Sequence, residues 1–361
     1  MKIAIFHDYF SSIGGGEKLV LTMAQHLGAD IISTDVDHRL IELMGFGNVN
    51  MISLGNISRK APLRQIQATI KFSSCDFRGK YKFFIFSGNW AHHASKKHKP
   101  NLFYCHTPVR AFYDQREAMA ASMNPATKAA FLGWTAVHRQ FDRRSIDRVD
   151  RIVCNSQNTA QRIKKYLGRD ATVIYPPVDT NKYHYISDDG YWLSVNRLYP
   201  EKRIEVQVEA FRRMPEEKLV IIGNSGIGDH SVEYAQRLRE DLPDNINIIS
   251  DVPEERLINY YGRCRGLIIT AADEDFGMTA VEAMASGKPV ITVAEGGYLE
   301  TMMDGVTGKL IEFSPNAIVH AVKDAGSGWK WSQAECEMRA RTYDTSRFVG
   351  EVRKALEPTI G

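Results

Sequence analysis

Two acidic residues frame a segment whose spacing is typical of a helix N-terminus. Between Ala272 and Ile291 the chain reads Ala-Asp-Glu-Asp-Phe-Gly-Met-Thr-Ala-Val-Glu-Ala-Met-Ala-Ser-Gly-Lys-Pro-Val-Ile, with Glu274 in an acidic loop and Glu282 eight positions later in the predicted helix. The first backbone N–H groups of a helix bind anions, and ionised carboxylates accept hydrogen bonds from sugar hydroxyls. The segment therefore suits a nucleotide sugar, with the diphosphate near Gly277–Thr279. An ordinary strand–turn–helix with two solvated acids fits the same spacing.

A pair of cations follows the first predicted strand of the second half, within Ser194-Val-Asn-Arg-Leu-Tyr-Pro-Glu-Lys-Arg203. Arg197 and Lys202 leave the carboxyl end of that strand, which is where open parallel sheets bind ligands. Two fixed cations can neutralise a diphosphate and stabilise it as a leaving group. Two unrelated surface cations are the alternative interpretation.

The first half carries two further candidate segments. Gly14-Gly-Gly-Glu17 lies between the first predicted strand and the first predicted helix, where glycine lets the backbone approach a phosphate. It is not the G-x-G-x-x-G fingerprint of dinucleotide binding, and a tight turn without a ligand is the alternative. His106 follows a predicted strand within Tyr104-Cys-His-Thr-Pro-Val-Arg110. A histidine there can bond a bound sugar or organise the reacting face, or it can be structural.

Two segments look like metal-binding sequences, and we favour another interpretation for both. Asp273-Glu-Asp275 spells the Asp-x-Asp signature of metal-dependent sugar transferases, but a predicted helix N-terminus follows at once and the cation pair above supplies positive charge. His92, His93 and His98 lie among three lysines, without acid or thiol partners at ligand spacing. We expect that segment to be a basic loop that is solvated or faces a membrane, and we expect no bound metal.

Both halves alternate short β-branched or aromatic runs with segments of helical periodicity, which predicts an α/β protein with parallel sheets and helical crossovers. The clearest helices are predicted at Glu17–Leu27, from an N-cap at Ser156 to Gly168, at Arg203–Met214 and at Glu254–Cys264, and the tail over 332–358 is also helical. The predicted strands are Lys2–His7, Asp30–Thr34, Phe83–Ser87, Leu102–His106, Arg151–Asn155, Thr172–Tyr175, Tyr191–Val195, Leu219–Ile222, Ile246–Ser250, Gly266–Thr270, Pro289–Val293 and Lys309–Ile311.

The segment Tyr175-Pro-Pro-Val-Asp179 interrupts this rhythm. Two prolines fix the backbone and remove two donors, so the segment should be extended and can serve as a hinge between domains. We expect one Rossmann-like domain over 1–178, completed by 344–361, and a second over 179–343.

Length and composition exclude several classes of protein. The chain has 361 residues, which is too long for one small module, and its 43% hydrophobic and 25% charged residues exclude wholesale disorder and a membrane-embedded body. It has no run of about 18 apolar residues. Its apolar N-terminus is short and resembles a strand rather than a signal peptide. The five cysteines never form a C-x-x-C pair, so a reducing cytosol is expected.

Charge is distributed unevenly along the chain. Residues 1–180 hold 25 Lys and Arg against 14 Asp and Glu, whereas 181–361 hold 21 against 29. A basic half indicates a first domain that meets an anionic partner such as phospholipid, nucleic acid or a phosphorylated acceptor. An unevenly charged, solvated surface is the alternative.

Taken together, these motifs resemble the family-four retaining glycosyltransferases, also called glycosyl transferase group 1. The resemblance covers nearly the whole chain and is strongest over 191–312, where the Glu-x7-Glu block with its Phe-Gly is joined by Gly296-Gly-Tyr-Leu-Glu-Thr and Asp-Gly-Val-Thr-Gly308. It implies the GT-B architecture, with two facing Rossmann-like domains of which the first binds the acceptor and the second the nucleotide-sugar donor. It also implies retention of anomeric configuration without a metal or cofactor.

The resemblance implies roles for individual residues. Arg197 and Lys202 match the cations on the donor diphosphate, Glu282 the acid on the ribose, and Glu274 the acid that contacts the donor sugar. His106 falls where the family often has an active-site histidine, so Glu274 and His106 are the catalytic candidates. The donor-binding candidates are Gly15, Gly16, Arg197, Lys202, Phe276, Gly277, Met278, Thr279 and Glu282. Many members have glycine where this chain has Asn196.

The donor and acceptor follow from a narrower likeness. His106-Thr-Pro-Val-Arg110 and Gly228-Asp-His230 resemble a mannosyltransferase branch that builds lipid-linked or surface glycans, as in polysaccharide biosynthesis. This implies GDP-mannose as donor, with a UDP-hexose as the alternative, and a glycan or lipid-diphosphate-linked acceptor. The protein would be cytoplasmic and peripheral on the anionic membrane face, held by its basic first domain.

Three other functions compete with this one. A nucleotide-sugar epimerase or hydrolase could share the fold. A catalytically silent nucleotide- or glycan-binding subunit should have a damaged site, whereas Arg197, Lys202, Glu274 and Glu282 are all present. Nucleic-acid binding would explain the basic half and should weaken steeply with salt; we expect no nucleic-acid partner.

Overall fold

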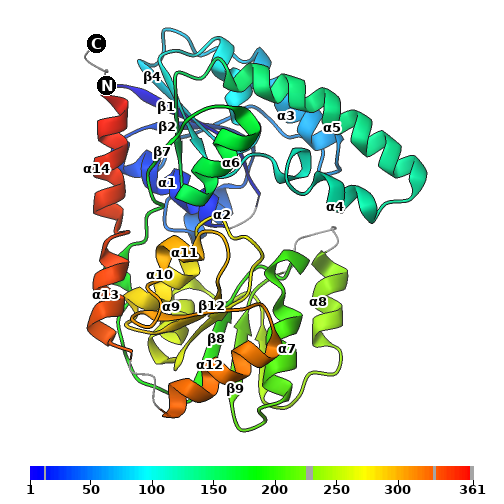
Figure 1. Cartoon of the computed structure of the whole chain (residues 1–361). Coiled ribbons are helices and arrows are strands. Elements are labelled where there is room, and N and C mark those ends of the chain that lie inside the picture. The colour runs from blue at the N-terminus through cyan, green and yellow to red at the C-terminus, as the bar shows by residue number, and fades with distance from the viewer. Residues whose placement is uncertain (12–13, 225–230, 328–330, 358–361) are drawn as a thin grey trace. The chain divides into compact units, whose positions relative to one another are not determined.

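The computed structural model describes residues 1–11, 14–224, 231–327 and 331–357. The chain divides into two compact units, the first formed by Met1–Pro177 with Phe348–Gly361 and the second by Val178–Arg347. Each unit contains one parallel β-sheet with helices packed on it (Figure 1). The boundary between Pro177 and Val178 falls in the proline-rich segment.

The sheet of the first unit has the strand order β3-β2-β1-β4-β5-β6-β7. Its strands are β1 (Ile3–Phe10), β2 (Asp30–Val36), β3 (Met51–Ser53), β4 (Phe83–Ser87), β5 (Asn101–Cys105), β6 (Arg151–Cys154) and β7 (Thr172–Val173). All neighbouring strands pair in parallel. Apart from the added seventh strand, this is the order of a doubly wound dinucleotide-binding fold.

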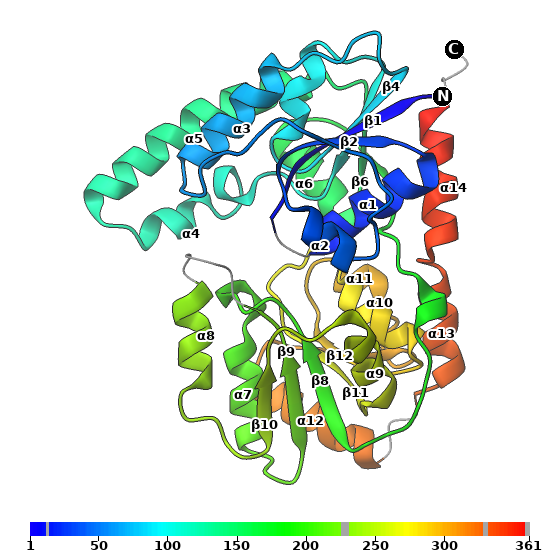
Figure 2. The same ribbon diagram turned by 180° about the vertical axis from the view of Figure 1, so that it is seen from behind.

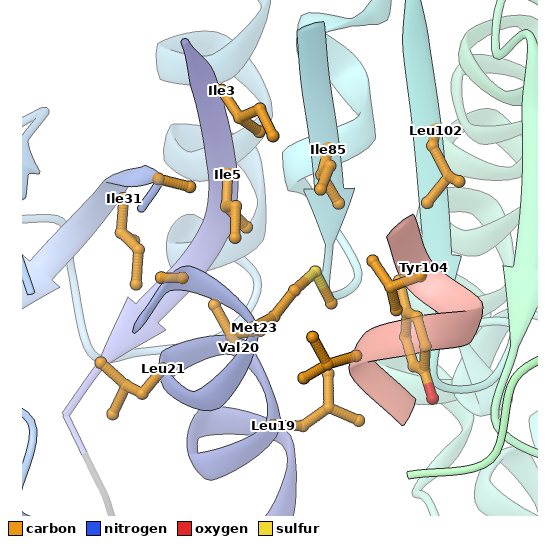
Figure 3. Close-up of a cluster of buried hydrophobic side chains, with 14 of the residues drawn as sticks. Ile3, Ile5, Leu19, Val20, Leu21, Met23, Ile31, Ile85, Leu102 and Tyr104 are labelled. Atoms are coloured by element: carbon orange, nitrogen blue, oxygen red, sulfur yellow. The ribbon is translucent and has the colours of Figure 1, made fainter. Parts of the chain in front are cut away.

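Alternate residues of each central strand enter two different cores. Ile3 and Ile5 of β1 lie in one cluster, which Figure 3 shows, whereas Ala4 and Phe6 lie in the other. Because both faces are buried, the strands are continuous apolar runs rather than alternating ones. The helices of this unit are α1 (Gly15–Leu27), α2 (His38–Leu43), α3 (Leu63–Ser74), α4 (Arg116–Ala121), α5 (Pro125–Ile146), α6 (Gln157–Leu167) and α14 (Thr345–Leu356) from Phe348 on, with short 3₁₀ turns η1 (Ala91–Lys96) and η2 (Arg110–Phe112).

The helix α14 completes the first core although it follows the second unit in the sequence. Phe348, Val349, Val352 and Leu356 are buried in the cluster shown in Figure 3, together with side chains of α1 and the central strands. The ring of Phe348 packs edge-on against Tyr104 of β5, with centroids 6.1 Å apart.

The second unit has a six-stranded parallel sheet in the order β10-β9-β8-β11-β12-β13 (Figure 2). Its strands are β8 (Tyr191–Val195), β9 (Lys218–Ile222), β10 (Ile246–Ile249), β11 (Gly266–Ile269), β12 (Val290–Val293) and β13 (Gly308–Ile311). Its helices are α7 (Ile204–Arg212), α8 (Ser231–Arg239), α9 (Glu254–Arg263), α10 (Met278–Ala285), α11 (Tyr298–Thr301), α12 (Pro315–Ser327) and α13 (Gln333–Arg341), with turns η3 (Thr180–Lys182) and η4 (Pro200–Lys202). One face of the sheet is buried under α7, α8 and α12.

Every predicted strand is present, β4 and β8 with the predicted bounds and most others with ends shifted by one or two residues, and the predicted helices are confirmed as well. The hydroxyl of Ser156 accepts from the N–H of Thr159 as an N-cap, and Gly168 ends α6 in a left-handed conformation. The helical tail is two helices rather than one. In the described residues, no helix combines the length and apolar character needed to cross a bilayer.

The sequence analysis missed β3 and the long helix α5. The first is only three residues long and partly exposed. In α5 the buried positions are mostly polar, namely Thr135, His138, Asp142 and Ser145, so hydrophobic periodicity gives no signal there.

Candidate active site

The sheet order of the second unit determines which loops meet. β8 lies between β9 and β11. The next strands along the chain, β9 and β10, lie on one side of β8, and the later strands β11, β12 and β13 lie on the other side. Open α/β sheets bind ligands beyond the carboxyl ends of the strands at such a switch point. The loop after β8 carries Arg197 and Lys202, and the loop after β11 carries Glu274. Three predicted site residues therefore belong to the two loops at this point.

Lys202 and Glu274 form an ion pair. Lys202 Nζ lies 2.5 Å from Glu274 Oε2, and each side chain is 23% exposed. Thr270 at the end of β11 fixes the backbone beside this pair, because its hydroxyl lies 2.9 Å from the carbonyl oxygen of Lys202 and accepts from Gln207. An ammonium group has three donors, so Lys202 can bind an anion while it stays paired with Glu274.

Gly277 turns the chain from the acidic loop into α10. Its φ is +92°, and a Cβ there would lie 2.6 Å from Cε1 of the buried Tyr298. Only glycine meets both requirements. Met278 and Thr279, which are half-buried, begin α10 directly after this turn. The N-terminus of α10 therefore lies after β11, at the predicted position for binding an anion.

Gly296 and Gly297 hold the acidic loop by close backbone packing. The N–H of Gly297 donates to the carbonyl oxygen of Glu274 at 2.7 Å. A Cβ on Gly296 would lie 2.5 Å from that same oxygen, and a Cβ on Gly297 would lie 2.5 Å from Cα of Phe276. The ring of Phe276 is buried against Tyr343, with centroids 5.2 Å apart. Phe276 can therefore offer a ligand only its backbone.

The carboxylate of Glu282, in α10, receives hydrogen bonds from two tyrosines. Tyr261 of α9 donates to Glu282 Oε2 at 2.7 Å, and Tyr183 also bonds the carboxylate. Burial, followed by the charge of Glu282, raises the pKa of both phenols well above 10. Both phenols therefore stay protonated as donors, and they orient the acid predicted to bind the ribose.

Arg197 is exposed, with its guanidinium over the ring of Tyr199 at 5.5 Å. The preceding residue is Asn196, a position where many members of the family have glycine. Its N–H donates to the carbonyl oxygen of Ile222, and its side-chain amide donates to the hydroxyl of Ser194. Arg197 thus projects into solvent from the turn after β8.

The switch point of the first unit lies between β1 and β4. Gly15 and Gly16 begin α1 after β1, and a Cβ on Gly16 would lie 3.7 Å from Cε1 of His106, which follows β5. His106 Nε2 lies 2.8 Å from the hydroxyl of Ser87 at the end of β4. Burial lowers the pKa of His106 to about 4. Its ring is therefore neutral at pH 7 and can donate from one nitrogen and accept at the other.

A buried acid, Asp8, shapes the loop beside His106. Its carboxylate accepts from the N–H groups of Asn89, Trp90 and Ala91, the last two at 2.8 and 2.9 Å. Gly88 has a φ of +101°, and a Cβ there would lie 2.5 Å from Cγ of Asp8. Burial raises the pKa of Asp8 to about 6 in spite of these bonds. Asp8 therefore anchors the loop that continues from Ser87.

The prediction of a solvated histidine loop is wrong. His92, His93 and His98 are buried, with 1%, 7% and 0% of their surface exposed, while Lys96 and Lys99 point outward. The segment forms η1, which folds back onto the sheet and packs under α3 and α5. No acid stands at ligand spacing in the sequence, but Asp142 of α5, about 50 positions away, reaches His92.

Several supporting residues had no signal in the sequence. Glu295 accepts from the guanidinium of Arg203 at 2.8 Å and from the N–H of Asp273 at 3.2 Å, and so ties the turn after β8 to the acidic loop. Ser87 and Tyr261 likewise act on residues distant in the chain. Only pairing of the parallel strands brings such residues together. The motif Gly228-Asp-His230 lies outside the described residues.

Each unit has a parallel Rossmann-like sheet with candidate residues in the loops at its switch point, which is the fold class of the GT-B proteins. Two family models cover most of the chain: glycosyltransferase family 4 matches residues 13–182 and glycosyl transferases group 1 matches residues 179–343. The chain belongs to this family of glycosyltransferases.

Individual relatives are distant. A D-inositol 3-phosphate glycosyltransferase of Mycolicibacterium smegmatis is 27% identical over 54% of this chain and 49% of its own length. The alpha-1,3/1,6-mannosyltransferase ALG2 of Saccharomyces cerevisiae is 29% identical over 58% of this chain and 49% of its own length. The matched region thus spans about half of these relatives. Anabaena HepE, solved with UDP and glucose, is 16% identical and superimposes with a TM-score of 0.75 over 99% of both chains.

Proposed function

We propose that this glycosyltransferase moves mannose from GDP-mannose to a glycan or lipid-diphosphate-linked acceptor, with retention of anomeric configuration and without a metal. The single observation that carries the donor site is the Lys202–Glu274 ion pair at the switch point of the second sheet, beside the N-terminus of α10. A cation and backbone N–H groups suit a diphosphate, and a carboxylate suits sugar hydroxyls.

Each predicted residue has a distinct part in the proposed reaction. Lys202 and Arg197 neutralise the diphosphate as the bond from the sugar to its oxygen breaks. Glu274 orients the sugar and Glu282 the ribose. The acceptor oxygen forms its bond to the sugar on the face that the diphosphate leaves, and the acceptor proton passes to the departing phosphate oxygen. The neutral ring of His106 bonds a substrate hydroxyl in the first unit.

The choice of mannose rests on two supports. The stretch His106-Thr-Pro-Val-Arg110 resembles the mannosyltransferase branch, and ALG2 proteins are among the relatives. A UDP-sugar donor is the alternative, because HepE has been solved with UDP-glucose. A catalytically silent subunit is a third possibility, which the intact Lys202–Glu274 pair disfavours.

We propose that the first unit binds the acceptor at an anionic membrane surface on the cytoplasmic side. The basic half of the chain supports this, at about 1 kcal/mol for each cation near the surface. The helices α3 and α5 lie side by side in Figures 1 and 2 and expose large apolar side chains, namely Leu63, Ile70, Val137 and Phe141. Exposed apolar residues beside cations are typical of interfacial helices.

The first experiment is thermal unfolding with GDP, UDP and ADP, each with EDTA and with a divalent metal in its place. A ligand at 100 times its Kd stabilises by about 2.7 kcal/mol, so GDP should raise the Tm and the others should not. Lys202→Ala should abolish the shift, whereas Lys218→Ala, at an exposed position of β9, should retain it. The product made from GDP-mannose and a lipid-diphosphate acceptor is then examined by NMR for its anomeric configuration.

Each outcome decides part of the proposal. A shift with UDP alone overturns mannose but keeps the donor site. A shift that requires a divalent metal overturns metal independence, and an inverted product overturns retention. No shift with any nucleotide, or an unchanged shift in Lys202→Ala, removes the donor site.

A further inference from the structure

Three potential metal ligands meet inside the first unit, on residues that the proposed reaction does not use. His92 and His93 lie on η1, after β4, and Asp142 lies on α5. One ligand atom from each lies within 4.8 Å of the others, and the three residues are 1%, 7% and 2% exposed. They form the only such group in the part of the chain that the structure describes.

His92 contacts the hydroxyl of Ser145 through one ring nitrogen and the carboxylate of Asp142 through the other. The hydroxyl of Ser145 donates its one proton to the carbonyl oxygen of His92 at 2.7 Å, so at its 3.0 Å contact with Nδ1 it must accept. The proton of a neutral His92 is therefore on Nδ1. Nε2 then has no proton, yet it lies 3.1 Å from Asp142 Oδ1. Two hydrogen-bond acceptors 3.1 Å apart repel each other. The repulsion is removed if a cation lies between them or if the His92 ring carries a second proton.

His93 adds a buried ring nitrogen, Nε2, without a hydrogen-bond partner among the described residues. A buried nitrogen without a partner is costly, and a neutral imidazole nitrogen is the atom that transition metals bind.

Asp142 has a second partner that fixes its orientation, as metal-binding carboxylates commonly have. Tyr113 donates to Asp142 Oδ2 at 2.6 Å and leaves Oδ1 toward His92. His138, whose ring centroid is 6.5 Å from that of His93, faces the hydroxyl of Thr69 instead and is not a ligand.

We propose that His92, His93 and Asp142 bind one divalent transition metal of the Zn²⁺ type. Tetrahedral ligands at about 2.0–2.1 Å from Zn²⁺ lie roughly 3.3 Å apart. The 3.1 Å separation of His92 and Asp142 meets this spacing, and the ligand atom of His93, which lies within 4.8 Å of the other two, must close by at most about 1.5 Å. Two imidazoles and one carboxylate favour Zn²⁺ or Co²⁺ over Mg²⁺ or Ca²⁺.

The surrounding charges partly balance such an ion. Asp142 supplies one negative charge, and the carboxylate of Asp8 interacts electrostatically with His92. Arg148 acts in the opposite sense on His93. The metal would join η1 to α5, so its role is structural. It does not enter the proposed transfer, whose diphosphate cations are Arg197 and Lys202.

The test uses the full chain, stripped with a chelator and then titrated with Co²⁺. One Co²⁺ per chain should produce a tetrahedral visible absorption band that an equimolar amount of Zn²⁺ removes, and Zn²⁺ should raise the Tm. X-ray absorption of the Zn²⁺-loaded chain should show nitrogen and oxygen neighbours with imidazole scattering. Asp142→Asn keeps the shape of the side chain and His93→Gln keeps its polarity, and each should bind Co²⁺ at least tenfold more weakly. His26→Gln, at an exposed position on α1, should bind as the parent does.

Four outcomes overturn the proposal. These are no stoichiometric Co²⁺ band, an unchanged affinity in both site variants, an equal loss in His26→Gln, and sulfur neighbours from the cysteines in the Zn²⁺-loaded chain. If one site variant does not fold, the other variant and the absorption spectrum of the parent still decide. A metal-free chain with an imidazolium at His92 is then the surviving explanation, and NMR of the His92 ring would show both nitrogens protonated.

Discussion

The substitution Gly277→Ala should damage both stability and donor binding. At φ +92° an L-residue is strained, by about 1–2 kcal/mol. The new Cβ would lie 2.6 Å from the ring of Tyr298, which is 1% exposed and cannot move aside; overpacking of this kind costs about 1–3 kcal/mol. The two effects together give a loss of about 2–5 kcal/mol, which in a unit of this size lowers the Tm by roughly 4–20 °C.

The assay combines calorimetric unfolding with titration of the nucleotide that stabilises the parent. Affinity should fall as well, because relief of the clash moves the first N–H groups of α10. Gly133→Ala is the control: Gly133 lies inside α5 with no atom within 4 Å of an added Cβ, and a helical Gly→Ala exchange stabilises by about 0.5–1 kcal/mol. If Gly277→Ala unfolds within about 1 °C of the parent and binds nucleotide equally well, the reasoning about this turn is refuted.

Other perturbations probe the remaining groups. Glu274→Gln should lower kcat more than nucleotide affinity, and equal losses in kinetics and titration would count against contact with the sugar. Arg197→Ala should weaken nucleotide binding in calorimetry with little change in Tm, because the side chain is exposed; unchanged binding would remove it from the site. Tyr261→Phe deletes a bond to the Glu282 carboxylate and should cost about 1.5–3 kcal/mol in denaturant unfolding, so a smaller loss would mean that the bond is weak. The pKa of His106 is about 4 when folded and 6.5 as an ordinary histidine, so the unfolded chain takes up this proton first and stability should fall as pH drops from 6.5 to 4. His106→Asn should flatten that part of the pH–stability profile, and an unaltered profile would contradict the buried neutral ring.

Local patterns were sufficient for most of the fold. The strands buried on both faces are unbroken apolar runs, as at Phe83–Ser87, and helix ends carry their own chemistry, as at Ser156 and Gly168. No local pattern in the sequence predicts that Lys202 pairs with Glu274. This pairing depends on β8 and β11 being neighbours although β9 and β10 come between them in the chain.

The errors share a physical cause. The segment around His92 and His93 carries enough lysine to look solvated, and whether it is buried depends on Asp142 and Ser145 in a helix that hydrophobic periodicity does not reveal. A polar buried stripe on a helix cannot be told from an exposed one by composition alone. Contact between distant polar residues therefore requires the structure.

The contribution of α14 to the first core has a consequence for how the chain matures on the ribosome. Phe348, Val349, Val352 and Leu356 are translated after the whole second unit, yet they cover apolar side chains of the first unit's strands. At about 5–20 residues per second, the nascent first unit waits roughly 10–30 s with that surface uncovered, while the second unit can finish its own core. The order of maturation is thus the reverse of the order of synthesis.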